Sequence, residues 1–214
     1  MVVEHHKFPN PPPPELLADI GADLTVVPAG TRLWRLYPSG GNHPTTWSTL
    51  RHFGPTDARF DHQAPPPHTD PVRAVAYYGA LGPLCVAERF QRTRRIDRRH
   101  PDRLRLAGFD LAAPVTLVDL RRLWPTRVGA SQAVATGPRS RSRRWAVAIY
   151  GAFGDRSDGI IYRSSMYGGD TAIAVWERGV GAFPATAVLD IALDDPQLTV
   201  ALANTARRLG YDLF

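Results

Sequence analysis

Hydrophobic and polar positions along the chain predict a series of β-strands. Residues 31–37 mix apolar and polar side chains and end at Pro38, whose missing backbone donor stops a strand. Arg35 is expected on the polar face of this strand. Other apolar segments of strand length predict strands at residues 24–27, 74–78, 113–120, 158–162, 171–176 and 187–192.

Two segments carry clear helix signals. Gly82-Pro83 places a proline in the first turn of a helix, and apolar residues follow at helical spacing, so Glu88 is expected on the second turn. A second helix is expected at residues 198–209, ended by Gly210. Strands and helices follow one another without a regular βαβ alternation. This order predicts a single α+β domain with a mixed or split β-sheet.

The first 23 residues differ in composition from the rest. Residues 8–14 are Phe-Pro-Asn-Pro-Pro-Pro-Pro, which predicts an extended or disordered arm over residues 1–23 before a domain at residues 24–214. Residues 64–71 are also rich in proline and predict a surface loop. A chain of 214 residues with 43% hydrophobic content can bury one substantial core. We find no apolar run of about 18 residues and no signal peptide, so a cytoplasmic protein without a membrane span is expected.

Arginine supplies nearly all of the positive charge. The 26 basic and 20 acidic residues give a net charge of +6, and Lys7 is the sole lysine. Residues 89–105 contain eight arginines but no aromatic residue between Phe90 and Phe109 that could stack on bases. We therefore interpret this stretch as a solvated or partner-facing segment, and direct binding of nucleic acid is not expected.

A third helix is expected from Ser140, as its N-cap, through Trp145 to Gly151. Its arginines 141, 143 and 144 crowd the positive end of the helix dipole, a placement that favours contact with an anion.

The sequence indicates no metal site. Cys85 is the only cysteine and lies in an apolar run, where it is expected to fill the core. The seven histidines, His5, His6, His43, His52, His62, His68 and His100, have no metal-ligand spacing.

The segment Asp158-Gly-Ile-Ile-Tyr-Arg-Ser-Ser165 carries the strongest motif. It reads as a strand that emerges from the core at clustered hydroxyls. Upstream, in order, lie Leu33-Trp-Arg35-Leu-Tyr-Pro38, Arg59-Phe-Asp61, and Tyr77-Tyr78 followed eleven residues after Tyr77 by Glu88. Together these segments resemble the RES-domain family over roughly residues 30–193. The proline-rich insertion at 64–71 and the arginine-dense stretch at 89–105 depart from the family pattern.

The resemblance implies a fold similar to ADP-ribosyltransferases and a toxin of a bacterial toxin–antitoxin pair that attacks NAD. It implies an Xre-type antitoxin as partner, so that an oligomer with the antitoxin is possible. NAD would be a substrate, with water or inorganic phosphate as co-substrate, and no resident cofactor is expected. By the matched positions Glu88, Arg35 and Tyr77 are the expected catalytic residues, and Arg59, Ser164, Tyr78 and Ser165 the expected substrate-binding residues.

Residue types alone fit the same chemistry. Cleaving nicotinamide from NAD develops positive charge at the ribosyl C1′, which a carboxylate stabilises. Glu88 would act there, the two arginines would hold the pyrophosphate, a tyrosine ring would stack on nicotinamide or close over ribose, and Ser164 would orient a ribose hydroxyl or Glu88.

Alternatives stay open for each residue. Tyr77 and Tyr78 point to opposite faces of a regular strand, and we favour Tyr77 for the site. Ser165 is the alternative to Ser164 as the hydroxyl of the site. Instead of acting in the site, Arg35 could form a salt bridge with an acidic residue across a sheet edge. In the same way, Arg59 could form a salt bridge with Asp57 or Asp61, and Glu88 could form one with Arg92.

Two other functions also fit the sequence. One is mono-ADP-ribosyl transfer from NAD to a cellular protein. The other is a non-enzymatic basic module that binds nucleic acid or a partner through its arginines, with binding that weakens strongly as salt rises.

Overall fold

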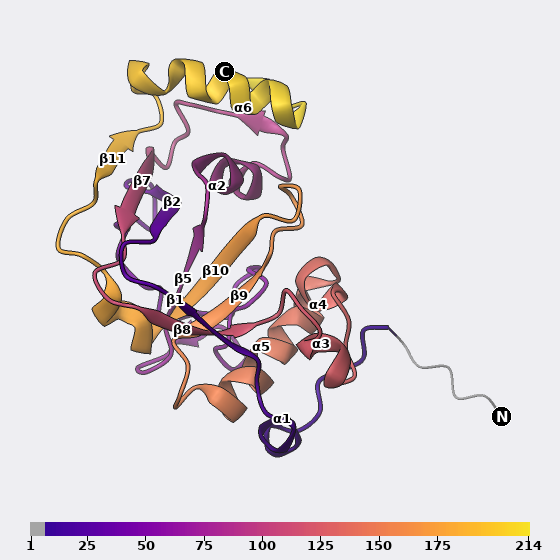
Figure 1. Cartoon of the computed structure of the whole chain (residues 1–214). Coiled ribbons are helices and arrows are strands. Elements are labelled where there is room, and N and C mark those ends of the chain that lie inside the picture. Colours follow the sequence, from indigo (N-terminus) through magenta and orange to yellow (C-terminus); the bar gives the residue numbers. More distant parts are fainter. Residues whose placement is uncertain (1–6) are drawn as a thin grey trace.

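An eight-stranded mixed β-sheet forms the centre of the molecule in the computed structural model, which describes residues 7–214 (Figure 1). The strand order is β1-β8-β9-β10-β5-β2-β7-β11, and every neighbouring pair is antiparallel except β8 and β9. The strands are β1 Leu24–Val27, β2 Arg32–Pro38, β5 Val75–Gly79, β7 Leu104–Asp110, β8 Val115–Asp119, β9 Gly159–Arg163, β10 Thr171–Trp176 and β11 Leu189–Ala192. The predicted α+β domain with a mixed sheet is confirmed.

Helices cover the sheet in two groups. α2 and α6 lie together at one end, and α1, α3, α4 and α5 gather at the other (Figure 1). The helices are α1 Pro14–Ile20, α2 Gly82–Arg89, α3 Trp124–Arg127, α4 Ala133–Thr136, α5 Arg139–Phe153 and α6 Thr199–Leu209, with short 3₁₀ helices η1 Glu177–Ala182 and η2 Pro196–Leu198. Two further pairs of short strands complete the fold, β3 Phe53–Gly54 with β4 His68–Thr69, and β6 Arg95–Ile96 with β12 Asp212–Leu213. None of these helices is long and apolar enough to cross a bilayer within residues 7–214.

Strands β2 and β5 meet at a single residue pair and then separate. Trp34 pairs with Gly79, whereas β2 pairs with β7 along its whole length on the other side. A side chain at position 79 would collide with helix α2, because an added Cβ would lie 2.8 Å from Leu84 Cδ2 and 3.0 Å from Cys85 Sγ. Glycine therefore lets α2 pack against the point where the two strands diverge.

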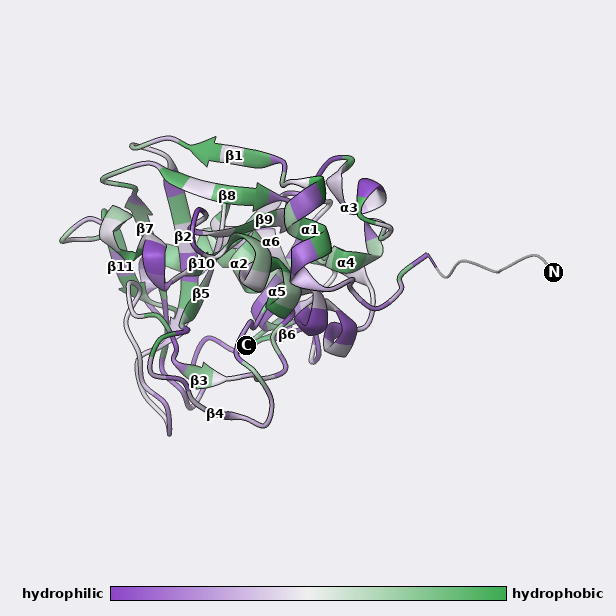
Figure 2. Ribbon diagram, turned by 90° about the horizontal axis from the view of Figure 1, so that it is seen from below, coloured by the Kyte–Doolittle hydropathy of each residue, from purple (hydrophilic) through white to green (hydrophobic). Residues whose placement is uncertain are grey.

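The core forms separate clusters on the two faces of the sheet. One cluster packs the helical group around α5 and contains Trp124, Trp145 and Phe60. The opposite cluster contains Trp47, Phe109 and Tyr78, and a third fills the space under α2 and α6. At one edge of the sheet, β1 and β8 lie side by side as largely hydrophobic strands (Figure 2).

Several local predictions are confirmed. α2 begins at Gly82 with proline in its first turn, and Gly210 ends α6 in the left-handed conformation at φ 65°. The expected cap at Ser140 is wrong. α5 begins one residue earlier, after Pro138, whose carbonyl accepts hydrogen bonds from the backbone of Arg141 and Ser142, and it continues past Gly151 to Phe153. Ser140 is therefore the second residue of the helix and not its cap, and no side chain caps the helix in its place.

The proline-rich N-terminal segment is extended as far as Pro13 and lies against α5. The indole nitrogen of Trp145 donates to the Pro9 carbonyl at 2.9 Å, and the Phe8 side chain is buried. Helix α1, which the sequence did not predict, then inserts Leu17 into the core. Residues 8–20 are thus packed as part of the domain.

Replacing Leu17 by Ala tests this packing. Leu17 is 0% exposed, so the substitution should lower the free energy of unfolding by about 2–5 kcal/mol through lost burial and a cavity. The neighbouring Leu16 is 53% exposed, and Leu16→Ala should change stability by less than about 0.5 kcal/mol. Urea unfolding of the full chain measures both. Equal effects of the two substitutions would mean that α1 does not dock.

Candidate active site

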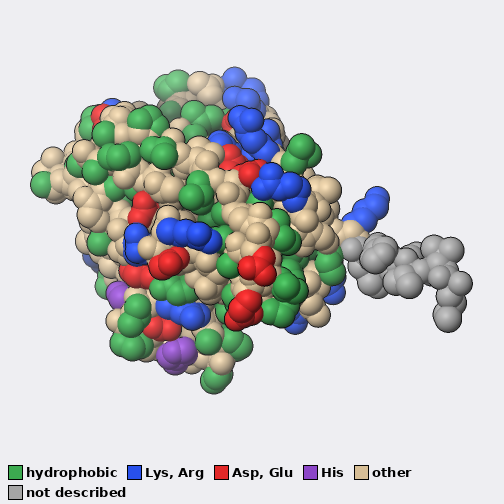
Figure 3. Space-filling model, turned by 60° about the horizontal axis from the view of Figure 1, so that its bottom comes forward, with side chains coloured by type: hydrophobic (Ala, Val, Ile, Leu, Met, Phe, Trp, Pro, Cys, Tyr) green, Lys and Arg blue, Asp and Glu red, His purple; other side chains and the backbone are tan. Residues whose placement is uncertain are grey.

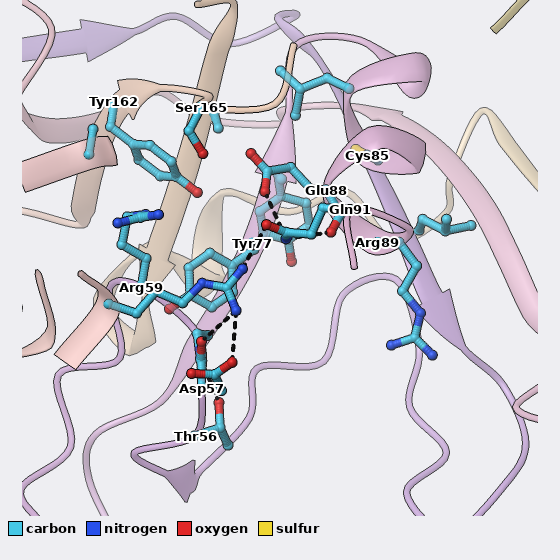
Figure 4. A pocket seen from close by; sticks show the side chains of 17 residues that line it. Thr56, Asp57, Arg59, Tyr77, Cys85, Glu88, Arg89, Gln91, Tyr162 and Ser165 are labelled. Atoms are coloured by element: carbon cyan, nitrogen blue, oxygen red, sulfur yellow. Dashed lines mark hydrogen bonds and ion pairs between the residues drawn. The ribbon is translucent and has the colours of Figure 1, made fainter. Parts of the chain in front are cut away.

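A pocket of about 510 Å³ opens where α2, β5, the end of β9 and the first turn of α5 converge (Figure 4). Five of the predicted site residues line it, namely Arg59, Tyr77, Tyr78, Glu88 and Ser165. Tyr162, Gln91, Asp57 and Arg139 also line it, and the sequence analysis did not select them. The pocket thus combines carboxylates, guanidinium groups and aromatic rings.

Glu88 is held at both carboxylate oxygens. The Ser164 hydroxyl donates to Glu88 Oε1 at 2.6 Å, and the Gln91 side-chain amide contacts Glu88 Oε2 at 3.3 Å. Ser164 is itself 3% exposed and accepts a hydrogen bond from the Met166 backbone. The Glu88 carboxylate on α2 and the Ser164 hydroxyl just after β9 therefore meet as expected, and Glu88 forms no ion pair with Arg92.

The choice between the neighbouring serines follows from strand alternation. Ile160, Tyr162 and Ser164 share one parity, so their side chains fall on the same face of β9. Ser164 reaches the glutamate, while Ser165 contributes to the lining of the pocket.

Tyr162 is buried next to Glu88, and both burial and the glutamate charge raise the pKa of its hydroxyl far above the ordinary value. Because side chains alternate along a strand, the expected site residue Ser164 places Tyr162 on the same face, and this alternation is the sequence signal that would have identified Tyr162.

Tyr77 and Tyr78 point to opposite faces of β5, as predicted. The Tyr77 hydroxyl donates to Asp61 Oδ1 at 2.7 Å and accepts a hydrogen bond from the Phe60 backbone at 3.2 Å. Burial and the neighbouring Asp61 charge raise the pKa of Tyr77 well above 10, so this hydroxyl stays protonated and does not act as a base. The Tyr78 hydroxyl donates to the Trp47 carbonyl at 3.2 Å within the opposite core cluster, and burial raises its pKa to about 12.

Asp61 is the buried acceptor that organises the loop before β5. Its side chain is 0% exposed, and it accepts hydrogen bonds from Arg51 Nη2 at 2.6 Å and from the Thr56 backbone and hydroxyl at 2.6 and 2.7 Å, besides that of Tyr77. A buried carboxylate needs several such donors to offset its lost hydration.

Arg59 lines the pocket, and no acidic residue of the described chain forms an ion pair with it. Its guanidinium donates to the Gly137 carbonyl and to Ser142 Oγ, the latter at 3.3 Å. Burial and then the charge of Arg139 lower the pKa of Arg59. Neither Asp57 nor Asp61 pairs with it, so the salt-bridge alternative does not occur here.

Arg35 is the one expected catalytic residue that the structure keeps apart from the others. Its guanidinium donates to the carbonyls of Trp47 and Thr49 at 3.0 and 2.7 Å and lies 5.5 Å from the Tyr78 ring centroid. It does not contribute to the lining of the pocket. The alternative of a salt bridge across a sheet edge is not seen either, and the arginine instead fixes the segment at 47–49 on the Tyr78 face.

The single cysteine is part of the core, and the described histidines and acidic residues do not form a metal site. Cys85 is buried, its thiol donates to the Trp34 carbonyl at 3.2 Å, and burial raises its pKa to about 12. In the part of the chain from residue 7 onward, no three His, Cys, Asp or Glu side chains are placed to hold a metal ion. His5 and His6 lie outside the described residues.

Half of the eight arginines in the arginine-rich stretch, namely Arg89, Arg92, Arg98 and Arg105, are bonded through their side chains to other described residues. Arg89 binds Asp102 at 2.7 Å, Arg105 binds Asp190 at 2.8 Å, and Arg98 donates to three backbone carbonyls at residues 193–195. Figure 3 shows one face of the surface, where acidic side chains lie beside many of the basic ones. Arg89 also points away from the other labelled side chains in Figure 4.

Comparisons with known proteins identify the family and the fold. A family model described as the RES domain matches residues 32–207. No curated protein matches the chain. A chain of the crystal structure of the M. tuberculosis MbcT–MbcA toxin–antitoxin complex is similar with a TM-score of 0.52 and 15% sequence identity, over 86% of this chain and 91% of that chain. At this identity the likeness shows a shared fold.

Replacing Tyr77 by Phe tests the role of its hydroxyl. The change leaves a buried Phe60 amide and one Asp61 oxygen with fewer partners, and should lower the free energy of unfolding by about 1–3 kcal/mol. Tyr211 offers a matched control, because its buried hydroxyl has no hydrogen-bond partner and Tyr211→Phe should cost nothing. Denaturant unfolding compares the two. If both variants were as stable as the parent, the Tyr77–Asp61 bond would have no structural role.

Proposed function

Because the chain belongs to the RES domain family, we propose that it is the toxin of a bacterial toxin–antitoxin pair and that it cleaves the bond between nicotinamide and ribose in NAD. The observation that carries the proposal is the 2.6 Å hydrogen bond from Ser164 to Glu88 inside a pocket that Arg59 and Arg139 also line. A fixed carboxylate beside two guanidinium groups suits a substrate with an electron-poor sugar carbon and attached phosphates. Cleavage would deplete cellular NAD.

The reaction develops positive charge on the ribosyl C1′ of NAD, and the protein supplies the negative carboxylate of Glu88 to stabilise it. As the bond from C1′ to the nicotinamide nitrogen breaks, its electron pair passes to the ring nitrogen, and the positive charge of the pyridinium moves to C1′. Glu88 stabilises that carbon, and Ser164 and Gln91 keep its carboxylate oriented before the charge develops. An oxygen of water, which loses a proton to the solvent, or of inorganic phosphate then bonds to C1′, which gives hydrolysis or phosphorolysis.

The other side chains bind and orient the substrate. Arg59 and Arg139 face the phosphates, and the rings of Tyr77 and Tyr162 offer apolar faces to nicotinamide or ribose. Tyr77 acts through its ring, since Asp61 and Phe60 occupy its hydroxyl. Arg35 donates to the Trp47 and Thr49 carbonyls through Nη1 and does not line the pocket, so a direct contact of Arg35 with NAD stays a prediction.

The partner we propose is an antitoxin of the Xre type, acting in the cytoplasm where NAD is abundant. The similarity in fold to a chain of the MbcT–MbcA toxin–antitoxin complex supports an antitoxin partner in general. The open reading frame next to the gene for this chain tests the proposal, since it should encode a helix-turn-helix protein.

Incubation of the purified chain with NAD tests the activity. Free nicotinamide with ADP-ribose indicates hydrolysis, and nicotinamide with a phosphorylated ADP-ribose that appears only when phosphate is present indicates phosphorolysis. Label transferred from NAD to a protein, with little free ADP-ribose, would favour the ADP-ribosyltransferase instead. NAD that stays intact at high enzyme concentration contradicts all three.

Glu88→Gln should lower kcat for NAD cleavage by about 100- to 1,000-fold, because an amide no longer stabilises the positive carbon. The fold should be retained, since the amide oxygen of glutamine still accepts from Ser164. The matched control is Glu15→Gln on the exposed face of α1, which should leave kcat unchanged. Growth arrest that persists in Glu88→Gln would instead support the non-enzymatic basic module.

A further inference from the structure

Three arginines surround one carboxylate at the rim of the pocket. Arg139 Nη1 donates to Asp57 Oδ2 at 2.8 Å, Arg92 Nη2 donates to the same oxygen at 3.2 Å, and Arg143 Nη1 lies 3.8 Å from Asp57 Oδ1. We call these four residues the Asp57 cluster. Its arginines come from the first two turns of α5 and from the segment after α2, so the fold brings them together from separate elements.

The positive charge of the Asp57 cluster exceeds its negative charge by two. Asp57 has to balance three guanidinium groups, and a fourth, Arg59, lies close enough to Arg139 for that charge to lower its pKa. Arg143 Nη1 is buried and has no hydrogen-bond partner among residues 7–214, since the contact with Asp57 is too long. Asp57 itself is 57% exposed on its side chain and can move aside.

The arginines also stand at the unfavourable end of their helix. α5 has no acidic residue in its first turn and no side-chain cap, while Arg139 and Arg143 add positive charge where the helix dipole is already positive. This arrangement costs stability in the free protein, and a bound anion would remove that cost.

A chain of hydrogen bonds joins the Asp57 cluster to Glu88. Arg139 Nη2 donates to Gln91 Oε1 at 2.7 Å, and Gln91 Nε2 donates to the Glu88 backbone carbonyl at 2.7 Å and contacts Oε2 at 3.3 Å. Figure 4 shows Asp57, Gln91 and Glu88 following one another along the same wall of the pocket. An anion bound by Arg139 would therefore lie in the same pocket as the glutamate.

We propose that the Asp57 cluster binds a doubly charged phosphate group, which takes the place of the Asp57 carboxylate against Arg92, Arg139 and Arg143. A phosphate at neutral pH carries about −1.5 to −2 charges and several acceptor oxygens, which matches the charge excess and the forked donors of arginine. The bound group is either inorganic phosphate or a phosphate monoester on a nucleotide. Binding stands independently of catalysis, whereas its use in a reaction rests on the proposed function.

The two sources use the site differently. Inorganic phosphate would supply the oxygen that bonds to C1′ as the electron pair of the broken bond passes to nicotinamide. A monoester, such as the 2′-phosphate of NADP, would anchor the substrate and take no part in bond breaking. The pyrophosphate of NAD carries one charge on each phosphorus and fits the doubly positive cluster less well.

Titration of the full-length chain with inorganic phosphate, followed by calorimetry, tests the binding site. Arg139→Gln and Arg143→Gln should each weaken binding by about tenfold, the usual loss with one charged hydrogen-bonding partner. Asp57→Asn should tighten binding by about fivefold or more, because it removes the competing negative charge. The matched control is Arg144→Gln, which removes one positive charge from an exposed position of the same helix and should leave affinity unchanged.

The sign of the Asp57→Asn effect separates a binding site from a structural salt bridge. Weaker phosphate binding in Asp57→Asn, an equal loss in Arg144→Gln, or no saturable binding in the parent chain would each overturn the proposal. Urea unfolding of every variant shows whether a loss of affinity reflects a loss of fold.

Turnover distinguishes the two sources of phosphate. If inorganic phosphate is the ligand, it should accelerate NAD consumption in the parent chain, and Arg143→Gln should raise the phosphate concentration for half-maximal acceleration by about tenfold while KM for NAD stays the same. If the monoester is the ligand, kcat/KM should be higher for NADP than for NAD, and Arg143→Gln should reduce that preference. A rate independent of phosphate with equal kcat/KM for both dinucleotides would contradict both uses. Absence of any dinucleotide cleavage refutes the proposed function, and the titration still decides whether the phosphate site exists.

Discussion

The site depends on a buried carboxylate that does not itself line the pocket. Asp61 is inaccessible to solvent and joins Arg51, Thr56 and Tyr77 through hydrogen bonds of 2.6–2.7 Å. These contacts close the loop that precedes β5, and that loop carries both Asp57 and Arg59 to the pocket. Because a buried charge is stable only while its donors stay in place, the position of the loop is coupled to the position of the Tyr77 ring.

Glu88 is held in a different way from Asp61, and the difference suits a different task. Asp61 uses both oxygens for four hydrogen bonds, whereas Glu88 accepts one short bond from Ser164 and one longer contact from Gln91. Its carboxylate is oriented and still faces the pocket, with acceptor capacity left for a substrate. The single pairing of β2 with β5 makes this possible, since a continuous ladder between these strands would close the space over which α2 places Glu88.

The sequence predicts the elements whose signals are local. Proline after Gly82 marks the start of α2, and Gly210 marks the end of α6. The alternation of side chains along a strand places Tyr77 and Tyr78 on opposite faces of β5. It does not predict contacts between distant segments. Asp61 looks like a surface partner for Arg59 in the sequence, and only the tertiary fold buries it beside Tyr77. The links from Gln91 to Arg139 and from Arg35 to the 47–49 carbonyls likewise join residues whose spacing carries no local signal.

The net charge of +6 is distributed unevenly in a way that composition does not reveal. In the stretch from 89 to 105, Arg89, Arg98 and Arg105 bind acidic side chains or carbonyls, so part of a dense run of arginine in the sequence becomes a set of internal contacts. At the start of α5, the chain instead gathers arginines around a single aspartate. Ion pairs exposed to solvent contribute little to stability. The excess positive charge of the Asp57 cluster, in contrast, attracts an anionic ligand. The local ratio of arginine to acid, judged in three dimensions, therefore indicates an anion site better than the number of arginines in a row.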